Sequence, residues 1–158
     1  MGVSLRIDPK FKDLINAFSA ENLRRYLTAV GDLELSKTRQ RFVKEIDPDG
    51  NPWQSTVRKA LDPSAKILRR TGVLFNSIQR QVSGNSVFIG TNLSYARTHQ
   101  EGATIRPRNA NFLAFRIGNQ FFRKKQVTIP QRRFIGINSG TQKSVEDAFQ
   151  STMRNILK

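Results

Sequence analysis

The chain has 158 residues and a formal net charge of +15 at pH 7, and its length suits one ordinary domain. It contains no cysteine. Disulfide frameworks and thiolate metal sites are therefore excluded, and an intracellular setting is the simplest expectation. No run of about 18 apolar residues is present and the N-terminus has no apolar signal core, so we expect neither a membrane span nor a secretion signal.

The positive charge is concentrated in one part of the chain. From residue 63 to residue 145 the sequence has fourteen bases and one acid, Glu101, which together contribute +13 of the total. A basic chain of this size is drawn to polyanions such as nucleic acid, an anionic membrane or an acidic protein surface. The bases in this span are Lys66, Arg69, Arg70, Arg80, Arg97, Arg106, Arg108, Arg116, Arg123, Lys124, Lys125, Arg132, Arg133 and Lys143.

The first 46 residues predict helices after a short strand at residues 3–7. Asp8 and Pro9 suit a helix start, and apolar residues at helical spacing follow up to Phe18. Ser19 suits the cap of a second helix. Gly31 interrupts the apolar stripe of that helix, so we expect either one long helix kinked near Gly31 or two helices in tandem.

Residues 47–53, DPDGNPW, predict a turn that stops the helix, because two prolines, a glycine and Asx residues disfavour its continuation. Short helical pieces are expected at residues 55–61, 64–69 and 73–78. The hydrophobic period then changes to two, and Gly84-Asn85 predicts a hairpin between residues 78–82 and 87–89. We expect one helical turn from Tyr95 to Gln100, with Gly102 as its C-terminal cap.

Residues 112–117 predict another strand, and Gly118-Asn119 predicts a turn after which residues 120–129 pair back. A last short strand is expected at residues 134–137, and Ser144 with Asp147 resembles the capping box of a final helix. N-terminal helices, a mostly antiparallel sheet built from hairpins, and a C-terminal helix packed on it predict an α+β fold. We expect a single domain, residues 1–158, with a helical part at 1–46, loop, short helices and sheet at 47–137, and the C-terminal helix at 138–158.

No set of residues completes a catalytic or metal-binding motif. His99 is the only histidine, and the His99-x-Glu101 pair lacks the Cys-x-x-Cys that a zinc deaminase needs. Asp47 and Asp49 resemble a calcium loop, but Arg58 stands where the bidentate Glu belongs. A phosphate-binding glycine loop is also missing. We therefore expect no enzymatic activity, no metal and no cofactor.

Basic residues alternate with aromatic residues between Arg106 and Lys125. One interpretation is a nucleic-acid surface on which Arg and Lys contact phosphates and Phe stacks on bases. The other is a sheet with Phe in the core and charge on the solvated face. The spacing of the phenylalanines suits burial, whereas a solvated face normally mixes both signs of charge and this one does not. Nothing in the sequence indicates sequence-specific recognition.

Several blocks resemble a known family in their order and spacing. They are residues 47–53 (DPDGNPW), 67–74 (ILRRTGVL), 77–78 (SI), 87–92 (VFIGTN), 95–102 (YARTHQEG) and 129–136 (IPQRRFIG). Together they resemble the virion-morphogenesis, or tail-completion, family of tailed bacteriophages and prophages, as in Mu-like phages. The resemblance covers about residues 40–137. Arg133 stands where the family pattern has proline, and a long basic insert separates Gly102 from Ile129.

The resemblance implies a structural virion assembly protein at the head–tail junction, such as a tail-completion, neck or tail-terminator protein. It implies a homo-oligomeric ring, expected from tail symmetry to be a hexamer, that joins or finishes the tail. The implied partners are neck, connector or tail-tube proteins and packaged DNA in the channel, with no membrane. The implied location is the virion, after assembly in the host cytoplasm. The alternative function is non-specific nucleic-acid binding.

The resemblance also implies architectural roles for the motif residues. Trp53 is expected to anchor the turn after the long helix, and Gly72 to separate two helices. Tyr95, His99 and Gln100 are expected to brace the segment between the sheet and its loop, with Gly102 closing that block. The residues expected to contact DNA or an acidic partner are Arg106, Arg108, Arg116, Arg123, Lys124, Lys125, Arg132 and Arg133.

Overall fold

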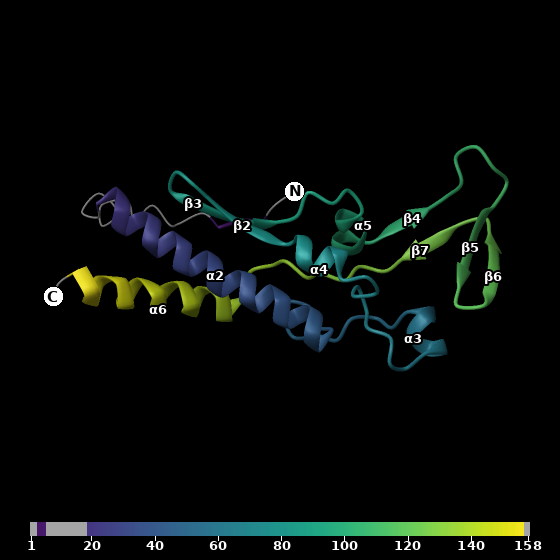
Figure 1. The fold of residues 1–158 in the computed structure, drawn as a ribbon, viewed down its shortest axis with the longest axis horizontal. Helices are drawn as coiled ribbons and strands as arrows, with labels where there is room; N and C mark the ends of the chain where they lie inside the picture. The colour runs from purple at the N-terminus through teal and green to yellow at the C-terminus, as the bar shows by residue number, and fades with distance from the viewer. Residues whose placement is uncertain (1–2, 6–18, 157–158) are drawn as a thin grey trace.

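A computed structural model describes residues 3–5 and 19–156, with side chains for residues 19–155. The helical stretch expected at residues 8–18 lies outside the described residues. Figure 1 shows an elongated molecule with a helical and sheet-containing body at one end and two successive β-ribbons projecting at the other. The combination of helices with antiparallel strands confirms the α+β class.

Helix α2 (Ala20–Lys44) is the longest element and runs through Gly31 as one helix. The Ser19 side chain accepts a hydrogen bond from the backbone N–H of Asn22, as expected for an N-cap. Gly31 lies where the sheet approaches the helix, because an added Cβ would be 2.7 Å from Cγ2 of Val87. The glycine therefore permits close packing of α2 against the sheet instead of dividing the helix.

Three strands form the sheet of the body. Strands β1 (Val3–Leu5), β2 (Gln79–Ser83) and β3 (Ser86–Gly90) are antiparallel in the order β1-β3-β2. The predicted β2–β3 hairpin is confirmed, with Val82 opposite Val87 and the turn at Gly84 in the left-handed region at φ 54°. The sheet packs on α2, and Val87 joins the buried residues of the helix.

The strands after residue 102 do not join this sheet. Strand β4 (Ala103–Ile105) pairs with β7 (Val127–Ile129), and β5 (Leu113–Ile117) pairs with β6 (Gln120–Lys124). The predicted return after Gly118-Asn119 is confirmed for residues 120–124, but the single strand predicted at residues 120–129 divides into β6 and β7, which have different partners. We call residues 103–131, with both ribbons, the arm (Figure 1).

Three short helices lie between the longer elements, and the last of them leads into the arm. Helices α3 (Val57–Leu61), α4 (Val73–Ser77) and α5 (Ala96–Glu101) confirm three predicted pieces. The piece predicted at residues 64–69 is wrong, because this stretch forms turns and Leu68 has a left-handed φ of 57°. Two of its apolar residues, Ala65 and Ile67, are nevertheless buried in the core.

Helix α6 extends from Ser139 to Ile156. It therefore begins before Ser144, where the predicted capping box of Ser144 and Asp147 placed its start. Asn138 and Thr141 form the reciprocal cap instead, with the Thr141 N–H donating to Asn138 Oδ1 at 3.0 Å and the Asn138 N–H donating to Thr141 Oγ1 at 3.4 Å. The strand predicted at residues 134–137 is also wrong, because these residues run as an irregular segment into the helix.

The C-terminal helix packs along α2, and this corrects its expected place on the sheet. The sheet and α6 lie on different sides of α2 in Figure 1. Lys37 Nζ on α2 donates to the Gly140 carbonyl at 2.8 Å, and the Tyr26 hydroxyl donates to the Val145 carbonyl at 3.3 Å. Phe149 stacks edge-on against Tyr26.

Two clusters of buried side chains form the core of the described residues. In the first, Phe42 is fully buried and its ring contacts Trp53, Phe75 and Phe134 at centroid distances of 5.1–5.8 Å. The second surrounds Leu27 and links α2 to the sheet and to α6. Phe42 thus joins the end of the long helix to segments far away in the sequence.

Replacing Phe42 with alanine is expected to lower the free energy of unfolding by about 3–5 kcal/mol, because it removes buried apolar surface and leaves a cavity. Urea unfolding followed by circular dichroism measures the change. Val43→Ala is the matched control: this neighbouring side chain is 57% exposed, so its loss should change stability by about 0.5 kcal/mol or less. Equal losses in the two variants would contradict this assignment of the core.

Candidate functional site

The predicted motif blocks converge on the irregular segment at residues 132–135. Trp53 ends the turn after α2, is buried, and donates from Nε1 to the Arg133 carbonyl at 3.0 Å. Its ring lies edge-on to Phe42 at 5.4 Å. Trp53 therefore connects the end of the long helix to a segment eighty residues later in the chain.

The turn before Trp53 is held by its own carboxylates. Asp47 Oδ1 accepts hydrogen bonds from the backbone N–H groups of Asp49 at 2.9 Å and Asn51 at 2.8 Å. Burial alone would raise the pKa of Asp47, but the hydrogen bonds from Asn51 and Asp49 outweigh it and hold that pKa below its ordinary value. Asp49 forms an ion pair with Arg133 at 3.1 Å. These carboxylates thus stabilise a turn.

Gln100 on α5 makes three hydrogen bonds to this segment. Its Nε2 donates to the Ile135 carbonyl at 2.7 Å, and its Oε1 accepts from the N–H groups of Phe134 at 3.0 Å and Ile135 at 3.2 Å. The side-chain amide thus pairs with the backbone much as a neighbouring strand would. Gly102 follows at φ 76°, and a Cβ there would lie 2.9 Å from the Gln131 nitrogen, so only glycine suits this close approach.

The other motif residues lie around the same block. The His99 carbonyl accepts from the Arg132 N–H at 2.7 Å, and the His99 ring lies edge-on to the half-exposed Tyr95. His99 Nδ1 is buried without a hydrogen-bond partner among the described residues. Burial, followed by the nearby charge of Arg132, lowers the pKa of His99, which favours a neutral ring. Gly72 caps α4 at φ 75°, but the residues directly before it form turns and not the expected helix.

Two of the eight predicted contact residues lie at the motif cluster, and the other six lie on the arm. Arg132 is only 4% exposed and donates to the carbonyls of Gln54 at 2.9 Å and Ser55 at 3.2 Å. It therefore supports the motif cluster and does not belong to the exposed basic surface. Arg133 is half-exposed and paired with Asp49. The other six lie on the arm: Arg106, Arg108, Arg116, Arg123, Lys124 and Lys125.

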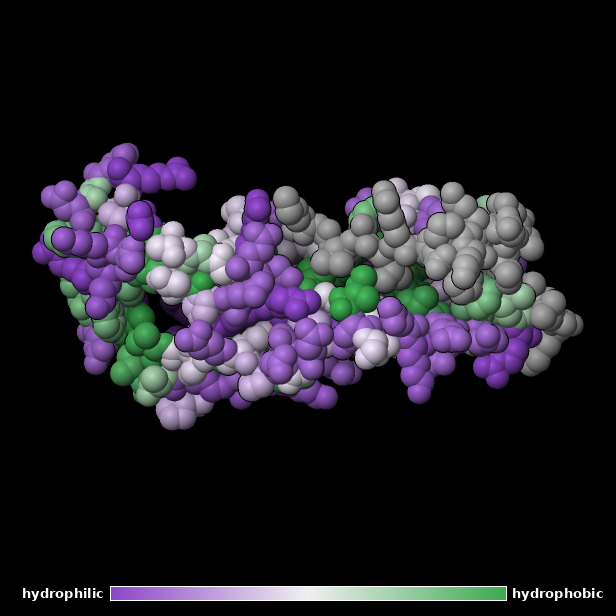
Figure 2. All heavy atoms as spheres, turned by 180° about the vertical axis from the view of Figure 1, so that it is seen from behind, coloured by the Kyte–Doolittle hydropathy of each residue, from purple (hydrophilic) through white to green (hydrophobic). Residues whose placement is uncertain are grey.

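The arm has no acid to balance these six bases. Arg106 donates to the Gln126 side chain at 3.2 Å, and the Arg123 guanidinium lies 5.1 Å from the centre of the Phe112 ring. Hydrophilic atoms cover much of the arm, at the left of Figure 2, beside smaller hydrophobic areas. Phe115 and Phe122 stack on each other across the two strands at 5.5 Å, so the expectation that the phenylalanines enter a core is met only within the ribbon.

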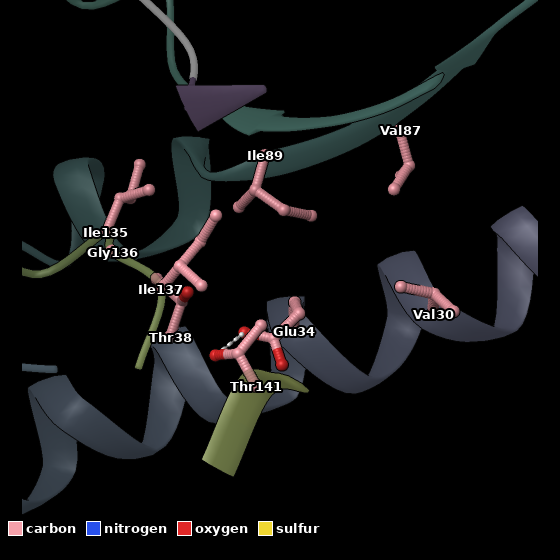
Figure 3. Close-up of a pocket in the computed structure, with 9 residues that line it drawn as sticks. All are labelled: Val30, Glu34, Thr38, Val87, Ile89, Ile135, Gly136, Ile137 and Thr141. Atoms are coloured by element: carbon pink, nitrogen blue, oxygen red, sulfur yellow. Dashed lines mark hydrogen bonds between the residues drawn. The ribbon is translucent and has the colours of Figure 1, made fainter. Parts of the chain in front are cut away.

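Figure 3 shows a small pocket between α2, β3 and the start of α6, which the sequence analysis did not anticipate. It has a volume of about 30 Å³ and is mostly apolar. Glu34 faces it and accepts a hydrogen bond from the Thr141 hydroxyl at 3.2 Å. The pocket is far smaller than the clefts of about 300–1,000 Å³ that hold organic ligands. We interpret it as a packing space at the α2–α6 junction.

The described part of the chain contains neither a group of three potential metal-ligating side chains nor a helix that is long and apolar enough to cross a membrane. The side chains of the motif cluster instead bind backbone groups. Its geometry can fix the relative positions of the body and the arm.

Replacing Gln100 with leucine should destabilise the protein, because two backbone N–H groups and one carbonyl lose their partner. An unsatisfied buried group costs about 1–3 kcal/mol. Thermal or urea unfolding measures the loss, and Gln142→Leu, at an exposed position on α6, is the control. Unchanged stability of Gln100→Leu would show that the segment at residues 132–135 holds its place without this residue.

A comparison with protein families agrees with these features. The family model described as the phage virion morphogenesis family matches residues 5–154, and so includes the body, the motif cluster and the arm. Neither a curated protein nor a solved structure matches the chain significantly. Since the match extends over nearly the whole sequence, the chain belongs to the phage virion morphogenesis family, and its role is in virion assembly.

Proposed function

We propose that the protein is a structural component of the head–tail junction, where it joins or finishes the tail as a ring of identical subunits. A hexamer matches the symmetry expected of a tail. The partners are neck, connector or tail-tube proteins, and the protein is incorporated into the virion after assembly in the host cytoplasm. The family role in virion morphogenesis supports this proposal, as does the elongated subunit with its projecting arm (Figure 1).

The arm is the observation that carries the proposal. Of the 27 bases, six are on the arm without any acid, and the remaining 21 share the rest of the chain with all 12 acids. A projecting ribbon with charge of one sign suits contact with a polyanion or an acidic protein surface. At a junction through which DNA passes, such arms give the channel a basic lining.

The motif cluster supports an architectural role without catalysis. Trp53, Gln100 and Arg132 all use their polar groups to bind backbone carbonyls or N–H groups. A ring that holds two large assemblies together needs a fixed angle between body and arm. Hydrogen bonds to residues 132–135, the segment into which the arm returns, supply that rigidity.

Charge reversal on the arm, with Arg123, Lys124 and Lys125 all changed to Glu, should impair head–tail joining or DNA retention. Complementation of a phage that lacks the gene measures infectious yield, and electron microscopy counts unjoined heads and tails. The matched control also reverses three charges, with Arg39, Lys44 and Arg70 changed to Glu at exposed positions outside the arm. Wild-type yield from the arm variant, or absence of the protein from purified virions, would refute the proposed function.

The same charge favours one alternative, a free-standing nucleic-acid-binding protein without sequence preference. This function predicts micromolar binding to duplex DNA whose affinity falls steeply with salt, because each neutralised phosphate releases counterions. Fluorescence anisotropy across a salt series measures the slope. A steep slope in a monomeric protein supports the alternative, whereas weak DNA binding by a stable oligomer supports the junction ring.

A further inference from the structure

The β5–β6 hairpin has two unlike faces. Paired residues of an antiparallel ribbon project to the same side. The register therefore places Leu113, Phe115, Ile117 and Phe122 on one face. The opposite face contains Ala114, Arg116, Phe121 and Arg123. Lys124 lies opposite Leu113 at the edge of the apolar face, and Lys125 follows it beyond the end of β6.

The apolar face of the hairpin is separate from the core of the body. Its four apolar side chains are only half-buried, and none of them belongs to the two buried clusters of the body. A two-stranded hairpin is marginally stable in water unless a further layer packs on it. The hairpin therefore has an apolar surface that needs a partner.

A groove of suitable character lies at the other end of the molecule, between α2 and α6. Its volume is about 880 Å³. Ala29 and Leu33 from α2 and Ala148 from α6 line it, and Leu33 is 44% exposed. Serine and threonine side chains make up much of the rest of the lining. Its lining residues are Asn22, Arg25, Ala29, Asp32, Leu33, Ser36, Ser144, Asp147, Ala148, Ser151, Thr152 and Asn155.

The charge at the groove complements that of the hairpin. Asp147 lines the groove and Glu146 is the exposed residue before it on α6, and neither has an ion pair among the described residues. The other charged side chains of the lining are already compensated, since Arg25 pairs with Glu21 at 2.5 Å and Asp32 pairs with Arg80. Asp147 in the groove, with Glu146 beside it in the sequence, therefore matches Lys124 at the edge of the apolar face, with Lys125 next to it.

The positions of the two surfaces decide how they meet. The hairpin and the groove lie at opposite ends of an elongated subunit (Figure 1), so contact between them requires two copies. Joining unlike surfaces of identical subunits is a heterologous contact, which generates a ring when the rotation closes. We propose that the apolar face of the β5–β6 hairpin of one subunit docks in the α2–α6 groove of the next. This inference rests on the proposed ring and names its subunit interface.

Docking in this orientation separates two roles of the arm. Leu113, Phe115, Ile117 and Phe122 are buried against Ala29, Leu33 and Ala148 of the neighbour, with Lys124 and Lys125 beside Glu146 and Asp147. Arg116 and Arg123 then face outward, where they are free to meet DNA or an acidic partner. A single hairpin thus supplies both the contact between subunits and the basic surface of the ring.

Cysteine cross-linking tests the orientation, because the natural chain contains no cysteine. Ile117→Cys combined with Leu33→Cys should form a ladder of linked species, up to the full ring, with a short bis-maleimide. Arg116→Cys combined with Leu33→Cys places the thiol on the opposite face and is the matched control. We expect a several-fold lower yield from the control pair. Equal yields, or no ladder from either pair in purified protein or in virions, would overturn the proposal.

Charge exchange tests the complementarity. The hairpin variant Lys124→Glu/Lys125→Glu and the groove variant Glu146→Lys/Asp147→Lys should each lose assembly, measured as mass by light scattering. Mixing them should restore the oligomer, because the altered hairpin fits the altered groove and the two native surfaces fit each other. Lys44→Glu/Arg70→Glu, at exposed positions outside the groove and the hairpin, should assemble like the natural chain.

Two results separate this inference from the proposed function. If the natural chain assembles and is found at the head–tail junction, but both charge variants assemble normally, the interface is wrong and the junction role stands. If mixing restores an oligomer that never enters virions, the interface stands and the junction role is wrong. A mixture that stays monomeric while the natural chain assembles contradicts the interface alone.

Discussion

Side-chain hydrogen bonds to the backbone of residues 132–135 are the constraint on which the rest of the structure depends. This segment has no strand partner, yet Gln100, Trp53 and Arg41 each bind its backbone. Phe134, whose N–H and carbonyl are both held in this way, is almost fully buried against Phe42. Since a buried backbone group without a partner is costly, these side chains make the burial possible.

The position of that segment fixes the two ends of the molecule relative to each other. Strand β7 brings the chain back from the arm, and residues 132–138 lead it into α6, which lies along α2. The same block therefore determines where the arm leaves the body and where the α2–α6 groove begins. A protein that builds a ring from its own two ends depends on this relation, because a small change in angle alters whether the ring closes.

The arm shows how a surface is kept available for assembly. Its ribbons have only two strands each, and its charge is of one sign. Bases without nearby acids repel one another and discourage the arm from folding onto a body that also has a net positive charge. The apolar face of the hairpin and the basic face are on opposite sides of one ribbon, and alternation along the strands alone produces this division.

The sequence by itself determined the local structure: the Ser19 cap, the turn at residues 47–53, the two tight hairpins and the stop at Gly102. Each depends on neighbouring residues whose backbone preferences act over a few positions. The family blocks also determined the role in virion assembly. Only the tertiary structure decided which strands pair, because β4 and β7 are too short and too distant in sequence to indicate each other. It also decided that Arg132 is buried while the six arm bases are exposed, and that Asn138 starts α6, since these depend on contacts between residues that are far apart in the chain.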